Sequence, residues 1–142
     1  MTDDLAAANV NRSYQLAASS IAIFTFLLFF LYPKFVSGEI NPWLFQAALI
    51  AMGIATFSFG FASFHYYGVS LGGRIEDATR SQYARRGDRF WLLGCVLLFL
   101  TPCLVLFTVG LIAVAFAWFA LWLVYLIFAL RIFPRIQAGG QS

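Results

Sequence analysis

His65 is the only histidine in the chain, and histidine is the side chain that changes its charge near neutral pH. It lies in Ser63-Phe64-His65-Tyr66-Tyr67, within a long apolar stretch, where an ionisable group is a candidate proton relay, metal ligand or haem ligand. The alternative is an interfacial histidine beside two tyrosines of the aromatic belt. With no second histidine and no carboxylate or cysteine nearby in sequence, we expect neither a metal site nor a cofactor. Copies of His65 around the axis of an oligomer would still give it a function.

Cys95 and Cys103 are the two cysteines, and their spacing excludes a disulfide between them. On one helix they would lie about 12 Å apart along the axis, whereas a disulfide needs Cα atoms within about 7 Å of each other. We expect both to behave as small apolar residues. The sequence also lacks a nucleotide-binding loop, a nucleophile elbow and a zinc motif, so we expect the protein not to be an enzyme.

Arginines concentrate between residues 68 and 89, in the one markedly charged segment of the chain. Basic side chains at a membrane surface attract acidic lipids, each contributing about 1 kcal/mol. Glu76, Asp77 and Asp88 dilute this charge, so fixing the topology is the alternative role. Every basic residue lies beside an apolar stretch or in this segment, and we therefore expect no nucleic-acid partner. The candidate residues for a lipid head group are Arg80, Arg85, Arg86 and Arg89.

The elements that position these residues are predicted to be membrane helices, because the chain is 62% hydrophobic and only 11% charged. The run from Phe90 to Leu130 contains no charged residue or histidine. As one helix it would be about 62 Å long, twice the roughly 30 Å core of a bilayer, so it must fold back as two spans. Two earlier apolar stretches bring the total to four. The predicted spans, in a single domain 1–142, are residues 14–32, 43–67, 90–108 and 111–133.

Turn residues set the expected span ends. Pro33 is predicted to stop the first helix, and Asn41-Pro42-Trp43 reads as an N-cap, a proline at the first helical position and an interfacial tryptophan. Asp88 is placed to cap the third span, and Gly110 to form a tight hairpin before the fourth.

The basic residues also predict the orientation. With four spans, all eight arginines fall on one side of the membrane and only Lys34 on the other. Positive charge in short loops stays in the cytoplasm. Both termini and the loop 68–89 are therefore expected to be cytoplasmic, and a cell inner (plasma) membrane is the default location.

Small residues form stripes on the second and last apolar stretches. In lipid, such stripes let neighbouring helices approach closely, so we expect them to pack helices within the chain or between subunits. The residues assigned to helix packing are Ala47, Ala51, Ala55, Ala113 and Ala117.

Aromatic and hydroxyl side chains within the spans offer further candidates. A mid-membrane indole such as that of Trp122 needs an acceptor for its N–H, so bundle packing or an aromatic-walled cavity for an apolar ligand are the two interpretations. The hydroxyls lie in the spans without charged neighbours, which disfavours an ion-coupled transporter and permits a passive pore. The candidate pore-lining or ligand-lining residues are His65, Ser58, Thr56, Trp118, Trp122 and Tyr125.

Together these features predict an all-α, polytopic membrane protein whose four transmembrane helices form two antiparallel hairpins, with both termini cytoplasmic. A small homo-oligomeric channel or passive transporter in the lipid bilayer is the leading functional hypothesis. The alternatives are a structural or accessory subunit bound to a membrane partner, and a protein that binds a lipid or an apolar small molecule, with anionic lipid as a further candidate partner.

Overall fold

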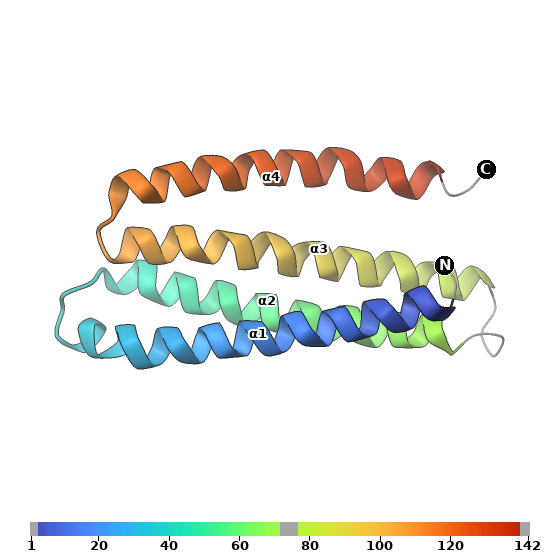
Figure 1. Ribbon diagram of the computed structural model, residues 1–142, viewed down its shortest axis with the longest axis horizontal. Helices are drawn as coiled ribbons and strands as arrows, with labels where there is room; N and C mark the ends of the chain where they lie inside the picture. The colour runs from blue at the N-terminus through green and yellow to red at the C-terminus, as the bar shows by residue number, and fades with distance from the viewer. Residues whose placement is uncertain (1–2, 72–76, 140–142) are drawn as a thin grey trace.

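The protein is all-helical in the computed structural model, which describes residues 3–71 and 77–139, with side chains described for residues 4–71 and 78–131. Neighbouring helices run side by side in alternating directions, so α1 begins and α4 ends at the same end of the molecule (Figure 1). Segments within all four helices are long and apolar enough to cross a bilayer. The helices are α1 (Asp3–Val36), α2 (Pro42–Ser70), α3 (Asp77–Thr108) and α4 (Ile112–Gly139).

The turns after α1 and α3 share one backbone design. Gly38 and Gly110 have positive φ angles of 75° and 80°, a conformation that glycine adopts without a steric penalty. In each turn the N–H after the glycine donates to a carbonyl five residues earlier, Glu39 N to Lys34 O and Leu111 N to Leu106 O, both at 3.0 Å. These bonds satisfy carbonyls at the helix ends in a Schellman motif. The turn predicted at Gly110 is confirmed.

The predicted start of the second helix is also confirmed. The Asn41 side chain accepts hydrogen bonds from Trp43 N at 3.0 Å and Leu44 N at 3.2 Å, and Pro42 is the first helical residue. A proline is tolerated there because its missing N–H has no partner within the helix.

The expected stop at Pro33 is wrong, because α1 continues through it to Val36. A proline near a helix end removes a single hydrogen bond, and Ser37 N still donates to Pro33 O at 3.0 Å. At the other end, α1 begins at Asp3, well before the predicted span. The helix α4 likewise passes Pro134 and ends at Gly139.

The loop predicted at residues 68–89 is largely helical. Helix α2 extends to Ser70, and α3 already begins at Asp77. Good helix formers occupy most of the segment after Asp77, which explains why it joins the following span as one helix. Asp88 therefore lies inside α3 and is not its N-cap. Arg74 and Glu76 lie outside the described residues, as does the side chain of Arg135.

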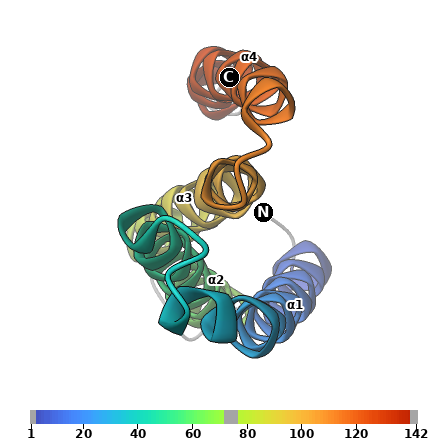
Figure 2. The ribbon, with the colours of Figure 1, turned by 90° about the vertical axis from the view of Figure 1, so that its left-hand side faces the viewer.

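Helix α2 lies between α1 and α3 and packs extensively against both, whereas α4 packs more sparsely and chiefly against α3 (Figure 2). Among the described side chains of α4, only Ala115 is fully buried. The assembly is thus an arc of three helices with α4 at one edge, and not a closed four-helix bundle.

Residues seven apart form the interfaces between these three helices, a period typical of left-handed packing at shallow crossing angles. The central helix supplies large side chains to them. The outer helices supply mostly small ones. The buried heptad positions are Ala6, Ser13, Ser20 and Leu27 on α1, Phe45, Met52, Phe59 and Tyr66 on α2, and Gly87, Gly94, Thr101 and Thr108 on α3.

The two predicted alanine stripes differ in their environment. On α2, Ala51 and Ala55 are buried, and Ala47 is half-buried. On α4, Ala113 and Ala117 are exposed, so they do not pack helices within this chain. Helix α4 meets α3 with a different face.

Candidate functional site

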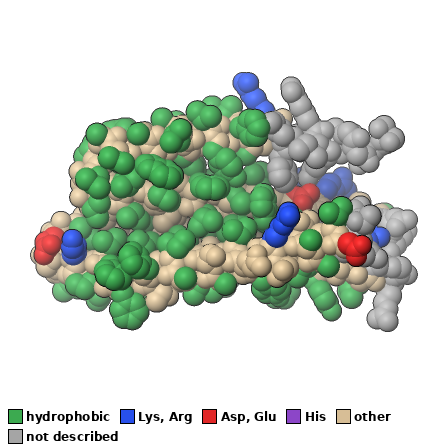
Figure 3. All heavy atoms as spheres, viewed as in Figure 1, with side chains coloured by type: hydrophobic (Ala, Val, Ile, Leu, Met, Phe, Trp, Pro, Cys, Tyr) green, Lys and Arg blue, Asp and Glu red, His purple; other side chains and the backbone are tan. Residues whose placement is uncertain are grey.

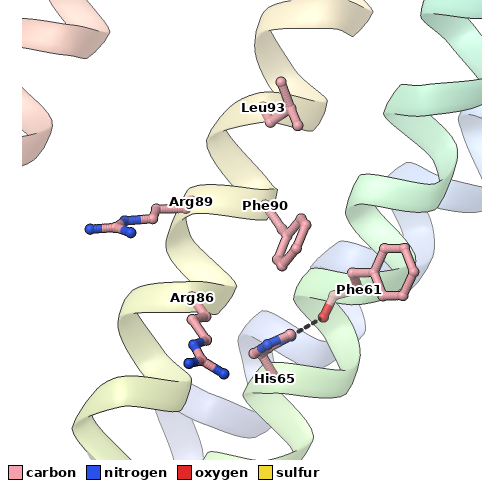
Figure 4. A pocket seen from close by; sticks show the side chains of 6 residues that line it. All are labelled: Phe61, His65, Arg86, Arg89, Phe90 and Leu93. Atoms are coloured by element: carbon pink, nitrogen blue, oxygen red, sulfur yellow. Dashed lines mark hydrogen bonds between the residues drawn. The ribbon is translucent and has the colours of Figure 1, made fainter.

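The most distinctive site is a hollow of about 590 Å³ between α2 and α3. Helix α2 contributes Phe61 and His65, and the remaining lining residues come from α3. In Figure 4 the Arg86 side chain extends from α3 on the side of His65, and the Arg89 side chain extends away from α2. The Phe90 ring lies between the two helices above His65. We call this site the basic hollow; its lining residues are Phe61, His65, Arg86, Arg89, Phe90 and Leu93.

His65 is held in one orientation by its own helix and by α3. Its Nδ1 lies 2.7 Å from the carbonyl oxygen of Phe61, and its ring centroid lies 5.3 Å from that of Phe90 and 5.8 Å from that of Tyr83. A carbonyl oxygen only accepts hydrogen bonds, so Nδ1 carries a proton and donates. Nε2 is then the ring atom available to a ligand.

A glycine allows this close approach of α2 to α3. A Cβ atom on Gly87 would lie 3.0 Å from Cε1 of Tyr66 and 3.3 Å from Cβ of His65. Both contacts are tighter than ordinary van der Waals separation. Gly87 therefore brings the histidine of α2 beside the arginines of α3.

The arginines predicted to meet lipid head groups divide into two groups. Arg86 and Arg89 are exposed, lie one helical turn apart and line the basic hollow. With Arg85 and Gln82 they also line an adjoining hollow of about 290 Å³. Arg80 is half-buried and lines neither hollow. Three of the four predicted arginines are thus brought together on one face of α3.

A polar link between α2 and α3 lies beside this site. The Tyr66 hydroxyl donates to Oδ1 of Asp88 at 2.6 Å, and both residues line a separate hollow of about 210 Å³ together with Asn9, Arg12 and Trp91. Sequence reasoning missed this pair. The two residues are 22 positions apart, and only the antiparallel contact of their helices brings them together.

The aromatic group on α4 forms a small, mainly apolar hollow of about 140 Å³ against α3. The Trp122 indole finds the acceptor that its depth requires, because its Nε1 donates to the carbonyl oxygen of Val96 at 2.9 Å. The Tyr125 ring lies 5.0 Å from that of Phe99, centroid to centroid. The lining residues are Phe99, Trp118, Leu121, Trp122 and Tyr125.

Most of the intramembrane hydroxyls are engaged with their own helices. Thr56 Oγ1, for example, donates to Met52 O at 2.9 Å, and Ser58 is buried. The same bond to the carbonyl four residues earlier is made by Ser20, Thr25, Thr101 and Thr108. Cys95 and Cys103 are buried and free, as predicted. Within the side chains that the structure describes, no group of three histidine, cysteine or acidic residues is placed to hold a metal ion.

The fold and these sites define a multi-pass membrane protein whose charged side chains flank a hydrophobic middle (Figure 3). Comparison of the chain with protein-family models, curated proteins and solved structures finds no match.

Proposed function

We propose that this protein is a non-enzymatic integral membrane protein that binds an anionic lipid at the cytoplasmic surface, with the head group in the basic hollow. The observation that carries this proposal is the pairing of Arg86 and Arg89 with an apolar wall. The wall consists of Phe61, Phe90 and Leu93. A free anion needs no such wall, whereas a lipid presents a charged head and an apolar tail to one site.

The proposed orientation follows from the charge distribution. Two antiparallel hairpins place α1's start, α4's end and the arginine-bearing part of α3 on one side of the membrane. This is the cytoplasmic side, because eight of the nine basic residues belong to it. The cytoplasmic leaflet of a plasma membrane is rich in acidic lipids, so the hollow and its ligand face the same surface.

The binding energy comes from charge and apolar contact together. Each arginine near an acidic surface contributes about 1 kcal/mol, and a guanidinium also binds phosphate oxygens in a fixed fork geometry. The long arginine stems can lie along the apolar wall while their charged heads stay at the interface. Exposed arginines on one helical turn are suited to this use.

Lipid titration of the purified protein in detergent micelles tests the proposal, with binding measured by native mass spectrometry. We expect short-chain phosphatidylglycerol to bind more tightly than phosphatidylcholine. The double variant Arg86→Gln/Arg89→Gln should lose about 2 kcal/mol, roughly 30-fold in affinity. Arg12→Gln/Arg131→Gln is the matched control, because it removes the same charge at exposed positions outside the basic hollow. Equal losses in both double variants would contradict a specific site.

The channel hypothesis is the second candidate, and it requires an oligomer. Of the two hydroxyl residues named as candidates to line a pore, Thr56 donates to the carbonyl oxygen of Met52 and Ser58 is buried, which lowers the support for a pore within one chain. The sparse packing of α4 favours assembly with another copy, because it leaves faces of α1, α3 and α4 available for contact. Solute flux in liposomes that contain a cross-linked oligomer tests this function. Absence of flux from that sample would exclude it.

A further inference from the structure

We infer that His65 makes the basic hollow selective for phosphomonoester head groups, the chemistry of phosphatidic acid, over phosphodiester head groups. This inference rests on the proposed lipid-binding function and identifies the class of lipid that binds. The geometry that carries it is that His65 on α2 lines the same hollow as Arg86 and Arg89 on α3, with the Arg86 side chain on the side of His65 (Figure 4).

The hydrogen bond to Phe61 O determines what His65 presents to a ligand. Because Nδ1 donates to that carbonyl at 2.7 Å, the neutral ring has an unprotonated Nε2, which is an acceptor. When the ring gains a proton, Nε2 becomes a charged donor. A neutral His65 therefore presents a lone pair that repels a phosphate oxygen in the hollow. A protonated His65 presents a charged N–H that binds it.

The charge of the ligand distinguishes the two lipid classes. A phosphodiester carries a single negative charge and is matched by one arginine. A phosphomonoester carries about −1.5 to −2 at neutral pH and has three terminal oxygens. Two guanidinium groups and a protonated imidazole match the charge and the oxygens of the monoester better.

Among the side chains that the structure describes, those that contact His65 or line its hollow carry no negative charge. From α3, the rings of Tyr83 and Phe90 contact it, and Arg86 and Arg89 line the same hollow. The carboxylate of Asp88 accepts the hydrogen bond of Tyr66 and lines the separate hollow with Arg12. A bound phosphomonoester is thus the anion that stabilises the proton on His65.

The experiment compares short-chain phosphatidic acid with phosphatidylglycerol in micelles of the full chain, at about pH 6.5 and about pH 8.5. At the lower pH, wild type should bind phosphatidic acid about tenfold more tightly than phosphatidylglycerol, since one charge-assisted hydrogen bond is added. This preference should fall several-fold at the higher pH, because an unprotonated Nε2 accepts hydrogen bonds and cannot donate one to phosphate. The pH comparison uses the unmodified protein and does not depend on the folding of a variant.

Two substitutions of His65 sharpen the test. His65→Phe keeps a ring and should lose the part of the preference that depends on pH, whereas the part supplied by the two arginines remains. His65→Gln retains an uncharged N–H donor at every pH, so its remaining preference should not change between the two conditions. Inorganic phosphate serves as a separate arm, and it should not displace phosphatidic acid at matched concentration, because it makes no use of the apolar wall.

The outcomes separate this inference from the function on which it rests. Equal wild-type binding of both lipids, with loss of both in Arg86→Gln/Arg89→Gln, overturns the selectivity and leaves the anionic-lipid site in place. A preference in His65→Phe that is as strong as in wild type and falls in the same way at the higher pH overturns the role of His65. Binding that does not depend on Arg86 and Arg89 overturns the proposed function itself. Displacement of phosphatidic acid by inorganic phosphate would reassign the site to a soluble anion.

Discussion

The ring of Phe59 on α2 occupies the space that a side chain on Gly94 of α3 would need. A Cβ atom placed on Gly94 would lie 2.7 Å from Cε1 of Phe59, well inside van der Waals contact. Phe59 itself is fully buried. Seven residues later on α2 and seven residues earlier on the antiparallel α3, the Tyr66 ring lies against Gly87 in the same way. Rings of α2 resting on glycines of α3 therefore set the distance between these helices.

We expect Gly94→Ala to destabilise the protein. The added methyl group must displace a buried ring in a close-packed interface, which costs about 1 to 3 kcal/mol. The higher helix propensity of alanine offsets about 1 kcal/mol of this at most. Gly60→Ala is the matched control, because a Cβ atom at Gly60 meets nothing within 4 Å. Unfolding in mixed micelles compares the two variants, and equal stability would show that the ring moves freely.

Tyr66→Phe should weaken the contact between α2 and α3 near the basic hollow. The substitution removes the donor of a 2.6 Å hydrogen bond to Asp88, and a bond to a charged group contributes about 1.5 to 3 kcal/mol. Tyr67→Phe, at an exposed position on the same helix, should have little effect. A double-mutant cycle with Asp88→Asn measures the coupling, and additive effects of the two changes would contradict a direct interaction.

Trp122→Phe should loosen α4 from α3. It removes the indole donor to Val96 O while retaining an aromatic ring. Interhelical hydrogen bonds in membranes contribute about 0.6 kcal/mol on average and up to about 1.7 kcal/mol, so a small loss of stability is expected. Distance measurements between spin labels on α3 and α4 should show a broader distribution than in wild type. Trp118→Phe, which alters the same aromatic hollow at a more exposed position, should keep the wild-type distribution.

Reporter fusions test the proposed topology. Fusions at the amino end, at the carboxyl end and within the segment around Arg85 should all report the cytoplasm, since this places eight basic residues inside. A fusion in the turn at Gly38 should report the opposite compartment. Opposite locations for the two ends would rule out four spans, and with them the placement of the basic hollow at the cytoplasmic surface.

Local features of the chain were predictable from the sequence, and helix ends where several signals compete were not. Asn41 before Pro42 is an N-cap in any context, and its two hydrogen bonds are formed as expected. Pro33 was assigned as a stop because proline disrupts helices, yet the Schellman turn at Gly38 ends α1 later. Asp88 has the residue type of a cap, but the helix formers before it extend α3 to Asp77.

The candidate site was only partly predictable. His65 and the arginines were each singled out by residue type, because charge in an apolar chain is conspicuous. Their meeting in one hollow was not, since it depends on the antiparallel register of α2 and α3 and on the small size of Gly87. The exposure of Ala113 and Ala117 could not be predicted either, because small residues permit close packing without specifying a neighbour.

The sequence by itself determined that this protein has four long apolar helices and where two of their turns lie. The reason is that hydropathy, helix hydrogen bonding and glycine turns act within short stretches of chain. Only the tertiary structure decided that α4 lies at the edge of a three-helix arc, that Tyr66 meets Asp88, and that His65 lines the same hollow as two arginines. Those relationships depend on how the faces of separate helices fit together, which no single stretch of sequence encodes.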